Sequence, residues 1–517
     1  METTSLPFHP NHNPPPLYQW PVLRIRMVNG APVATGPSHA AFGNPRRASP
    51  SVDVPTDPWA EWTWDSTRLI ARTDRYGFSP LFYQIDPDGI RISPSLITLL
   101  ESGASKDIDD AGLAVMLRTG FFVGEDTAFR NIRIVPPHGV LTWEGGKTDV
   151  RGSLVTVQQE PYTRTSAVDA YIERFREAVR RRPSDGMTIL PLSGGRDSRH
   201  IFLELCAQGR APDIAVTIGP PPAYHTEEVI RAHQVAVAAG VQHLAFRAPD
   251  PQWPAENKTR VDTHFATTDH WWLQTLLGYL DFMRRSQPLP LTVYEGVAGD
   301  VLSTFIRKTP ERERLYAEGK FEPLAEVMLD DEGYLPRMLR PELYRRLSRE
   351  AARVRLAEEL ARHANQAHPL ASFIVYNRTR RVTGLPPSSL MGPLATVWCP
   401  YLDADVFDFL MSLPPSILVG QTIQEFHDTA IKKAYPKFAD IPFASKNVSK
   451  KRLAPLYQMK LIRDMTADLM QHKPNLIKPA FLYARLARAT IDVGYWKEVY
   501  KISSLSNYLL QLSRYTA

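Results

Sequence analysis

One nine-residue stretch, LPLSGGRDS at residues 190–198, constrains the fold and chemistry of this chain most strongly. It follows the largely apolar segment Met187–Leu190 and precedes the apolar positions Ile201, Leu203 and Leu205. This order predicts a buried strand, a glycine turn and the start of a helix. Small residues let the backbone approach a ligand closely, and amide groups at a helix N-terminus bind phosphate oxygens.

The same stretch predicts a phosphate site with a metal ion. Asp197 lies where a Mg²⁺ ion that bridges phosphates needs a carboxylate. The GK[ST] ending of a Walker A loop is absent, which disfavours γ-phosphate transfer. An ordinary capped strand-to-helix turn is the alternative, but the order S-G-G-x-D-S after a buried strand favours the phosphate site. The residues expected to line this phosphate site are Leu192, Ser193, Gly194, Gly195, Arg196, Asp197 and Ser198.

Length and composition limit the class of protein. A chain of 517 residues is too long for one core, so two or more domains are expected. Residues 1–20 are rich in proline, lack a signal-peptide pattern and are interpreted as a flexible lead. The two cysteines, Cys206 and Cys399, exclude a disulfide framework and fit a cytoplasmic protein. Apolar runs are short and the net charge of +6 is mild, so neither a membrane nor a nucleic acid is expected as a partner.

The first part of the chain, residues 21–160, reads as a β-rich domain of short strands and turns. The turn sequence DPDG at 86–89 predicts a hairpin, and EGGK at 144–147 predicts another turn.

The second part, residues 165–517, alternates strands with helices and then becomes almost entirely helical after about residue 305. The predicted strands are 187–192, 214–219, 241–246 and 291–294, and the predicted helices are 166–181, 227–239 and 266–284. Such alternation predicts a parallel sheet, whose ligand sites lie at the carboxyl ends of the strands. The strand exits at Ser193 and Gly296 could therefore line one cleft.

Several segments resemble the asparagine synthetase family. The SGGRDS loop resembles the pyrophosphatase loop of ATP pyrophosphatases. Residues 72–83, RTDRYGFSPLFY, resemble the RDRxGxxPLYY stretch, and residues 129–139 resemble the segment that closes the glutaminase-like domain. Residues 296–300, GVAGD, 400–403, PYLD, and 441–446, IPFASK, resemble the motif GDGGDE, the motif PFLD and the lysine-bearing tail. Asparagine synthetase B, β-lactam synthetases and lasso-peptide cyclases share this organisation.

The resemblance implies an α/β and α+β two-domain fold. A degenerate N-terminal nucleophile-type, β-rich glutaminase-like domain would span residues 21–160. An adenine nucleotide α-hydrolase-like synthetase domain, with a parallel sheet and a helical C-terminal part, would span residues 165–517. The implied activity is an ATP- and Mg²⁺-dependent ligase that adenylates a carboxylate, releases pyrophosphate and transfers the acyl group to ammonia or an amine.

The resemblance also implies roles for single residues. Asp197 and Asp300 would bind Mg²⁺, and Lys446 would neutralise charge on the α-phosphate and on the tetrahedral intermediate. The catalytic residues would thus be Asp197 and Lys446, and further ATP contacts would come from Thr217, Ile218, Gly219 and Gly296.

Departures from the family pattern are informative. The family's glutaminase needs a cysteine at mature position 2, where this chain has Glu2, so we expect no glutaminase activity. Val297 replaces a family Glu, Tyr or His, and Thr396 and Trp398 replace the Glu and Arg of ExRxPFLD. Glu295 is a possible replacement for the missing base, and the other interpretation is that it only ends a strand.

Two alternative functions stay open at this stage. One is macrolactam or β-lactam closure, in which a peptide or carrier could bear the substrate, and the other is a non-catalytic nucleotide-binding homologue. His225 is expected near the ribose of ATP. Asp269 and His270 precede Trp271 and Trp272, which are expected to face the core with Asp269 as a cap, and the alternative is that they face the substrate. Arg378, Arg380 and Arg381 are expected to be solvated helix charges, and the alternative is that one of them contacts pyrophosphate. The identity of the substrates and the oligomeric state are left undetermined.

Overall fold

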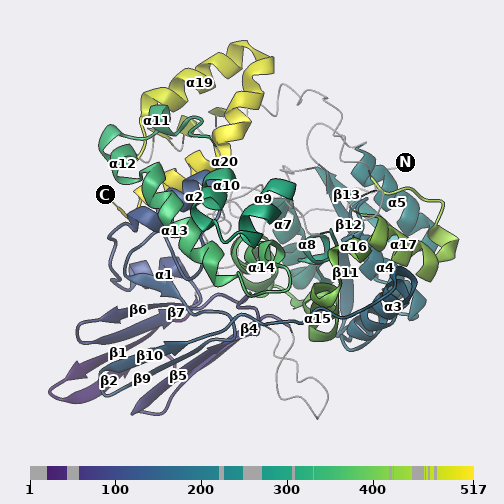
Figure 1. Cartoon of the computed structure of the whole chain (residues 1–517), viewed down its shortest axis with the longest axis horizontal. Helices are drawn as coiled ribbons and strands as arrows, with labels where there is room; N and C mark the ends of the chain where they lie inside the picture. Colours follow the sequence, from purple (N-terminus) through teal and green to yellow (C-terminus); the bar gives the residue numbers. More distant parts are fainter. Residues whose placement is uncertain are drawn as a thin grey trace.

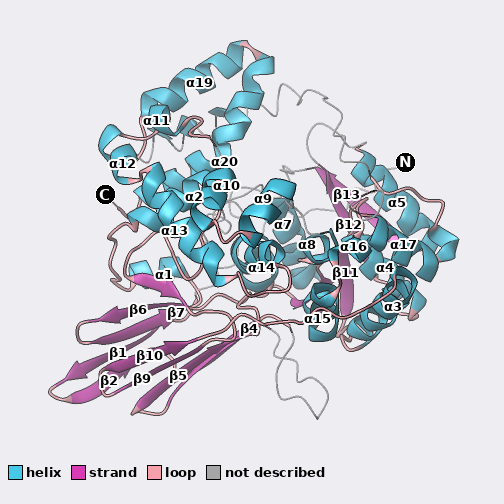
Figure 2. Cartoon of the chain, in the orientation of Figure 1, coloured by secondary structure: helices cyan, strands magenta, loops and turns pink. Residues whose placement is uncertain are grey.

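The structure is a computed structural model of the 517-residue chain. It describes residues 20–43, 57–219, 226–247, 271–304, 309–329, 331–418, 422, 424–444, 459, 462–463, 466–467, 469–470 and 474–516. The fold mixes helices and strands, with antiparallel sheets in the N-terminal part and a parallel sheet with helices after it (Figures 1 and 2). The predicted Pro-rich lead at residues 1–20 falls almost entirely outside the described residues.

The N-terminal part contains two antiparallel sheets of five strands each. The first has the order β2-β1-β7-β6-β8 and the second β10-β9-β5-β4-β3. Their strands are β1 Leu23–Val28, β2 Ala31–Thr35, β3 His39–Gly43, β4 Trp59–Trp64, β5 Arg68–Thr73, β6 Phe82–Asp86, β7 Gly89–Ser93, β8 Ile132–Ile134, β9 Val140–Glu144 and β10 Lys147–Arg151. One hydrophobic core, with Trp62 and Trp143 fully buried, contains side chains from both sheets, so the sheets pack face to face.

The predicted hairpin at 86–89 is confirmed, and the predicted turn at 144–147 also joins two paired strands. Asp86 pairs with Gly89 where β6 turns into β7, and Glu144 pairs with Lys147 where β9 turns into β10. Two helices interrupt the strands, α1 at Leu96–Glu101 and α2 at Asp110–Thr119, and the expectation of strands and turns alone is wrong there. Residues 112–118 of α2 are all buried, so the sequence shows no polar face with a helical period.

The second part contains a parallel sheet of five strands in the order β13-β12-β11-β14-β15. The strands are β11 Met187–Pro191, β12 Ile214–Gly219, β13 Gln242–Arg247, β14 Leu291–Tyr294 and β15 Thr396–Trp398. The predicted parallel sheet is confirmed, and the chain after residue 305 is almost entirely helical as predicted, with β15 as the one strand that the described residues add there. This strand has only three residues, too few to show a pattern, and it forms because Val397 pairs beside the buried β14.

Helices make up most of the remaining chain. They are α3 Arg164–Arg180, α4 Asp197–Ala207, α5 Glu227–Ala239, α7 Trp271–Ser286, α8 Gly299–Thr304, α9 Pro310–Ala317, α10 Phe321–Met328, α11 Leu335–Met338, α12 Pro341–Arg346, α13 Arg349–Arg362, α14 Pro369–Ile374, α15 Ala404–Ser412, α16 Pro415–Leu418, α17 Glu425–Ala434, α19 Pro479–Ile491 and α20 Trp496–Ser513. Two π-helices are η1 Val375–Thr383 and η2 Pro386–Met391. Three short 3₁₀-helices are η3 Pro400–Leu402, η4 Pro436–Phe438 and η5 Val493–Tyr495. The predicted helix 227–239 is confirmed as α5, and Gly240 ends it with a φ of 75°, which favours glycine. In the part of the chain that the structure describes, no helix is both long and apolar enough to cross a membrane.

Two arginines join the helical part to the N-terminal part. Arg380 donates to the carbonyls of Gly77 and Val135, each at 2.9 Å, and Arg381 donates to the carbonyls of Gly124 and Asp126. The expectation of solvated charges is therefore wrong for Arg380 and Arg381. It fails because η1 packs against loops whose carbonyl groups need donors.

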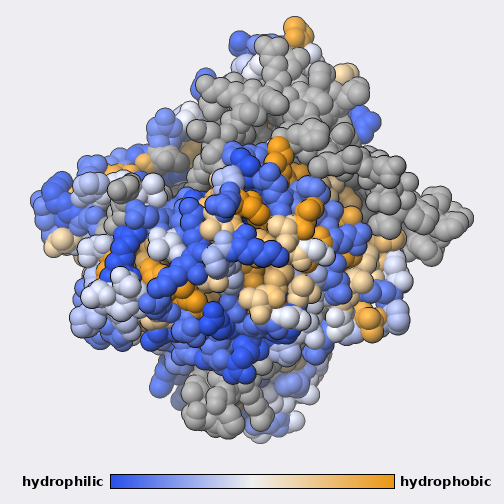
Figure 3. Space-filling model, turned by 90° about the vertical axis from the view of Figure 1, so that its right-hand side faces the viewer, coloured by the Kyte–Doolittle hydropathy of each residue, from blue (hydrophilic) through white to orange (hydrophobic). Residues whose placement is uncertain are grey.

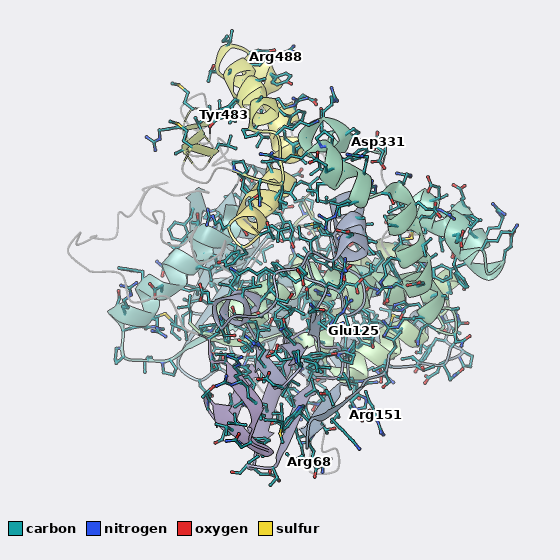
Figure 4. The ribbon with its side chains drawn as sticks, turned by 90° about the vertical axis from the view of Figure 1, so that its left-hand side faces the viewer. Arg68, Glu125, Arg151, Asp331, Tyr483 and Arg488 are labelled. Atoms are coloured by element: carbon teal, nitrogen blue, oxygen red, sulfur yellow. The ribbon has the colours of Figure 1, made fainter. Side chains whose placement is uncertain are left out.

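Figure 4 shows the same junction from another side. Arg68 of β5 lies in the sheet region at one end, Arg488 of α19 lies at the other, and Glu125 lies between them. Glu125 accepts from Arg362 of α13 at 2.9 Å, so an ion pair also crosses this junction. The predicted domain limits stay predictions. Residues 152–163, around the predicted boundary, form no helix or strand.

A buried charge triad links three separate segments. Arg182, directly after α3, donates to Asp57 at 2.9 Å and to Asp403 at 2.8 Å, and all three side chains are fully buried. Burial disfavours the guanidinium charge, but the two carboxylates outweigh burial and raise the pKa of Arg182. Asp403 also caps α15, so the motif PYLD serves the architecture here.

Replacing Arg182 tests this triad. The change Arg182→Met leaves the buried Asp57 without its cation and Asp403 with only Arg181, at 3.4 Å, so we expect the free energy of unfolding to fall by about 3–5 kcal/mol. Urea unfolding measures the loss. The matched control is Arg180→Met, because Arg180 pairs with Glu177 on the exposed face of the same helix. This control should leave the urea midpoint unchanged, and equal midpoints for the two variants would contradict the role given to the triad.

Candidate functional site

The glycine loop lies at the carboxyl end of the parallel sheet, between β11 and α4. Asp197 occupies the first turn of α4, and the loop after the neighbouring strand β14 packs directly against it. A Cβ atom on Gly299 would lie 2.7 Å from the Asp197 Cγ atom, so only glycine permits this approach. The exits of β11 and β14 thus lie side by side.

The amide groups of the loop already have acceptors inside the protein. Ser193 N–H donates to the Ser198 hydroxyl at 3.0 Å, and Gly195 N–H donates to the Ser193 hydroxyl at 3.1 Å. Gly194 N–H donates to a carboxylate oxygen of Glu228 at 2.7 Å. No side chain caps α4, so its first-turn amides are the part of the predicted cradle that suits an anion.

A segment after α17, residues 441–444, holds the loop from the other side. Ala444 N–H donates to the Gly194 carbonyl at 2.9 Å, and Arg199 donates to the carbonyls of Ile441 and Pro442. A Cβ atom on Gly194 would lie 2.8 Å from the Ala444 Cβ atom, which explains the glycine. Lys446, two positions further, lies outside the described residues.

Arg196 is paired through its guanidinium with a carboxylate of the protein. It forms a two-point ion pair with Asp428 of α17, with one N–O distance of 2.9 Å, and its guanidinium lies over the Phe443 ring at 4.5 Å. Its predicted contact with ATP stays a prediction. Figure 3 shows the face nearest to α5 and α17 as largely hydrophilic, with a smaller apolar area near its centre.

Two carboxylates, Asp197 and Asp300, form the acidic part of the site. The Asp197 side chain is 26% exposed, and burial together with the Asp300 charge raises its pKa well above the usual range. Asp300 itself is exposed at the start of α8. Among the described residues, no group of three or more His, Cys, Asp or Glu side chains could hold a metal alone. The pair therefore fits a Mg²⁺ ion that also takes phosphate oxygens as ligands.

A buried polar cluster lies directly behind Asp197, and it was not predicted from the sequence. It consists of Tyr171 of α3, His200 of α4, Ser303 of α8, Tyr401 of η3 and His427 of α17, each at most 1% exposed. The Nε2 atom of His427 lies 3.1–3.4 Å from His200 Nδ1 and from the two phenol oxygens. His200 follows Asp197 by one helical turn, which is the only sequence signal that could have drawn attention to it.

Glu295 has an unusual protonation equilibrium. It follows β14, its backbone N–H donates to the Trp398 carbonyl at 2.8 Å, and burial raises the pKa of its carboxyl to about 7. Its charge also raises the pKa of Asp197. Val297 and Trp398, at positions where the family has polar residues, are both buried. Glu295 is thus a carboxyl in this region that is half ionised near neutral pH.

The other predicted ATP contacts lie at the end of β12. The Thr217 hydroxyl on β12 donates to the carbonyl of Leu192, directly after β11, at 2.6 Å. It also lies 2.8 Å from His243 of β13, so Thr217 links three neighbouring strands of the sheet. Ile218 and Gly219 end β12 at the same edge of the sheet as Ser193 and Gly296. His225, Asp269 and His270 lie outside the described residues.

Comparisons with known proteins are sparse. No family model matches the chain, and no curated protein matches it. Among solved structures, it is similar to the U34-tRNA thiolase NcsA from Methanococcus maripaludis with its [4Fe-4S] cluster, at 13% identity over 44% of this chain and 84% of that chain, with a TM-score of 0.23. It is also similar to the glutamine phosphoribosylpyrophosphate amidotransferase from B. subtilis complexed with ADP and GMP, at 10% identity over 48% of this chain and 76% of that chain, with a TM-score of 0.18. At these TM-scores neither similarity carries an argument.

The protonation of Glu295 can be tested through stability. The folded chain holds this proton up to a pH of about 7, whereas the unfolded chain releases it near the ordinary value of 4.5. The free energy of unfolding should therefore fall as the pH rises through this window, by up to about 3 kcal/mol. Glu295→Gln removes the loss, so the variant should be more stable than wild type at pH 8 and similar at pH 4.

Thermal unfolding at both pH values measures this difference. The control is Glu144→Gln, because the Glu144 side chain is 66% exposed and its substitution removes a solvated surface charge. A Glu295→Gln variant that loses as much stability as wild type between pH 4 and pH 8 would show that Glu295 titrates normally.

Proposed function

We propose that the chain is an ATP-dependent ligase of the asparagine synthetase type, which adenylates a carboxylate, releases pyrophosphate and forms an amide. The observation that carries the proposal is the position of the Asp197 carboxylate. It lies at the uncapped N-terminus of α4, beside Asp300, where the neighbouring strands β11 and β14 end. Carboxylates beside free helix amides suit a magnesium-bound polyphosphate.

The reaction begins with attack of the substrate carboxylate on the α-phosphorus of ATP. The bond from this phosphorus to the bridging oxygen breaks, and pyrophosphate leaves with the bond electrons. Asp197 and Asp300 would hold Mg²⁺, which when bound supplies charge neutralisation at the phosphate oxygens. The first-turn amides of α4 would receive pyrophosphate oxygens, and Lys446 would stabilise the charge that develops.

The second step forms the amide. An amine attacks the acyl carbon of the adenylate and displaces AMP, and the nitrogen must lose a proton. We assign this proton to Glu295, because a pKa of about 7 leaves much of its carboxyl ionised at neutral pH. The side chains of Val297 and Thr396 cannot act as a base, so Glu295 is the proposed proton acceptor.

The amine would not come from glutamine hydrolysed by this chain. Burial raises the pKa of Cys206 to about 11 and that of Cys399 well above its usual range, so neither thiol forms the thiolate that a nucleophile needs. Ammonia or an amine on the second substrate is therefore the proposed acceptor. Within this proposal the two antiparallel sheets correspond to a glutaminase-like domain without its nucleophile.

One observation favours a second candidate, a non-catalytic homologue that keeps the fold. The loop amides of Ser193, Gly194 and Gly195 are bonded inside the protein, and Arg196 is paired with Asp428. Polyphosphate binding by these groups requires that such bonds be exchanged. Turnover measurements separate the two candidates.

Replacing Asp197 tests the ligase directly. Asp197→Asn keeps the size of the side chain but removes the charge that would bind the metal, so pyrophosphate release from ATP should fall by about two orders of magnitude or more. A coupled pyrophosphate assay with Mg²⁺ and a panel of carboxylates and amines measures it. Asp88→Asn, on the exposed β6–β7 turn, is the control. Unchanged turnover in Asp197→Asn would remove the loop from the mechanism.

The proposed role of Lys446 predicts that its removal lowers turnover but leaves ATP binding nearly unchanged. A cation that meets charge formed mainly in the transition state contributes to the rate more than to ground-state affinity. Lys446→Ala should therefore lower amide formation by about 10²–10³-fold while calorimetry finds a similar Kd for ATP. Lys432→Ala, on an exposed position of α17, is the control. Loss of ATP affinity in step with the rate would contradict this role.

A further inference from the structure

The imidazole of His427 faces Asp197 from inside the protein. Its Nδ1 atom lies 3.3 Å from the Ser303 hydroxyl oxygen and 3.6 Å from a carboxylate oxygen of Asp197. A neutral imidazole carries one proton, on either Nδ1 or Nε2. Which nitrogen carries it decides whether His427 attracts or repels the carboxylate.

Ser303 determines that proton. Its hydroxyl donates to the Gly299 carbonyl at 2.7 Å, which leaves its oxygen only as an acceptor toward His427. The Nδ1 atom must therefore bear the hydrogen, and Nε2 is the acceptor. This agrees with the neighbours of Nε2, since His200 Nδ1 at 3.1 Å and the Tyr171 hydroxyl at 3.4 Å can both donate.

The rings of the cluster are tightly packed, and burying its polar atoms costs free energy. The His200 ring stacks on Phe175 with centroids 3.8 Å apart, and the Tyr171 ring stacks on Phe426. The His200 Nε2 atom is buried without a hydrogen-bond partner. Apolar side chains would fill this space without such a penalty, so packing alone does not account for the two imidazoles.

We propose that His427 is a positioning residue for the metal site. Its Nδ1–H group, fixed by Ser303, directs a positive dipole at Asp197 and restrains the orientation of the carboxylate that would bind Mg²⁺ together with Asp300. This inference rests on the proposed function. Partners behind a metal ligand commonly change metal affinity by about 10–100-fold.

Two isosteric variants test the geometry. In His427→Asn the amide nitrogen can take the place of Nδ1, whereas in His427→Gln it reaches only the place of Nε2. The probe is Mn²⁺, whose free concentration is followed by electron paramagnetic resonance with the full chain and α,β-methylene-ATP. We expect His427→Asn to bind Mn²⁺ within about 3-fold of wild type and His427→Gln to bind it about 10–100-fold more weakly.

The outcomes separate this inference from the proposed function. Equal Mn²⁺ affinity in His427→Gln and wild type would overturn the positioning role and leave the ligase untouched. Absence of Mn²⁺ binding in wild type with the nucleotide analogue would overturn both.

A second measurement covers variants that do not fold. Long-range ¹H–¹⁵N spectra of the wild-type chain, labelled at histidine, report the tautomer of each ring. We expect His427 to be protonated at Nδ1, and protonation at Nε2 would overturn the inference without any substitution.

Discussion

The Asp197 carboxyl, held at the edge of a largely buried sheet, is the constraint about which the site is built. Burial, Asp300 and Glu295 all oppose its ionisation, and Arg196 favours it. That arginine is itself paired with Asp428. The neutral His427 ring adds only a dipole. Because the neighbouring acidic groups oppose the charge of Asp197, a divalent cation would favour its ionised form.

The loop that carries Asp197 is held by segments that are distant in sequence. Glu228 of α5 accepts from one side of Gly194, and Ala444 donates to its carbonyl from another. Asp428 of α17 fixes Arg196. Because β12, α5 and α17 converge on one turn, a change in any of them alters the support of the loop. In the sequence, Ala444 precedes the proposed catalytic cation Lys446 by two positions.

The sequence predicted elements whose patterns are local. The strand 214–219, the helix 227–239 and the strand 291–294 have the predicted limits, because apolar runs and a C-terminal glycine mark them. The helix α2 was missed because it is buried on all sides, and β15 was missed because it is short. Arg380 and Arg381 were misplaced because only the folded chain brings carbonyl groups to them.

The residues of the candidate site were also predictable only where they are contiguous in the sequence. The loop and Asp197 are visible in the sequence, since their residues are contiguous. His427 is not visible, since it meets His200 across 227 positions and resembles an ordinary helix residue in its own segment. Nor does the sequence show that the Gly194 amide is bonded to Glu228, a contact made only when α5 packs on the loop.

The central claim is that the N-terminus of α4, with Asp197 and Asp300, holds a magnesium-bound triphosphate. A crystal structure of the full chain with Mg²⁺ and α,β-methylene-ATP tests it most directly. The account predicts triphosphate density against the first turn of α4, with a metal ion between the phosphates and Asp197. Nucleotide density elsewhere on the molecule, with the loop and Asp197 unchanged, would contradict it.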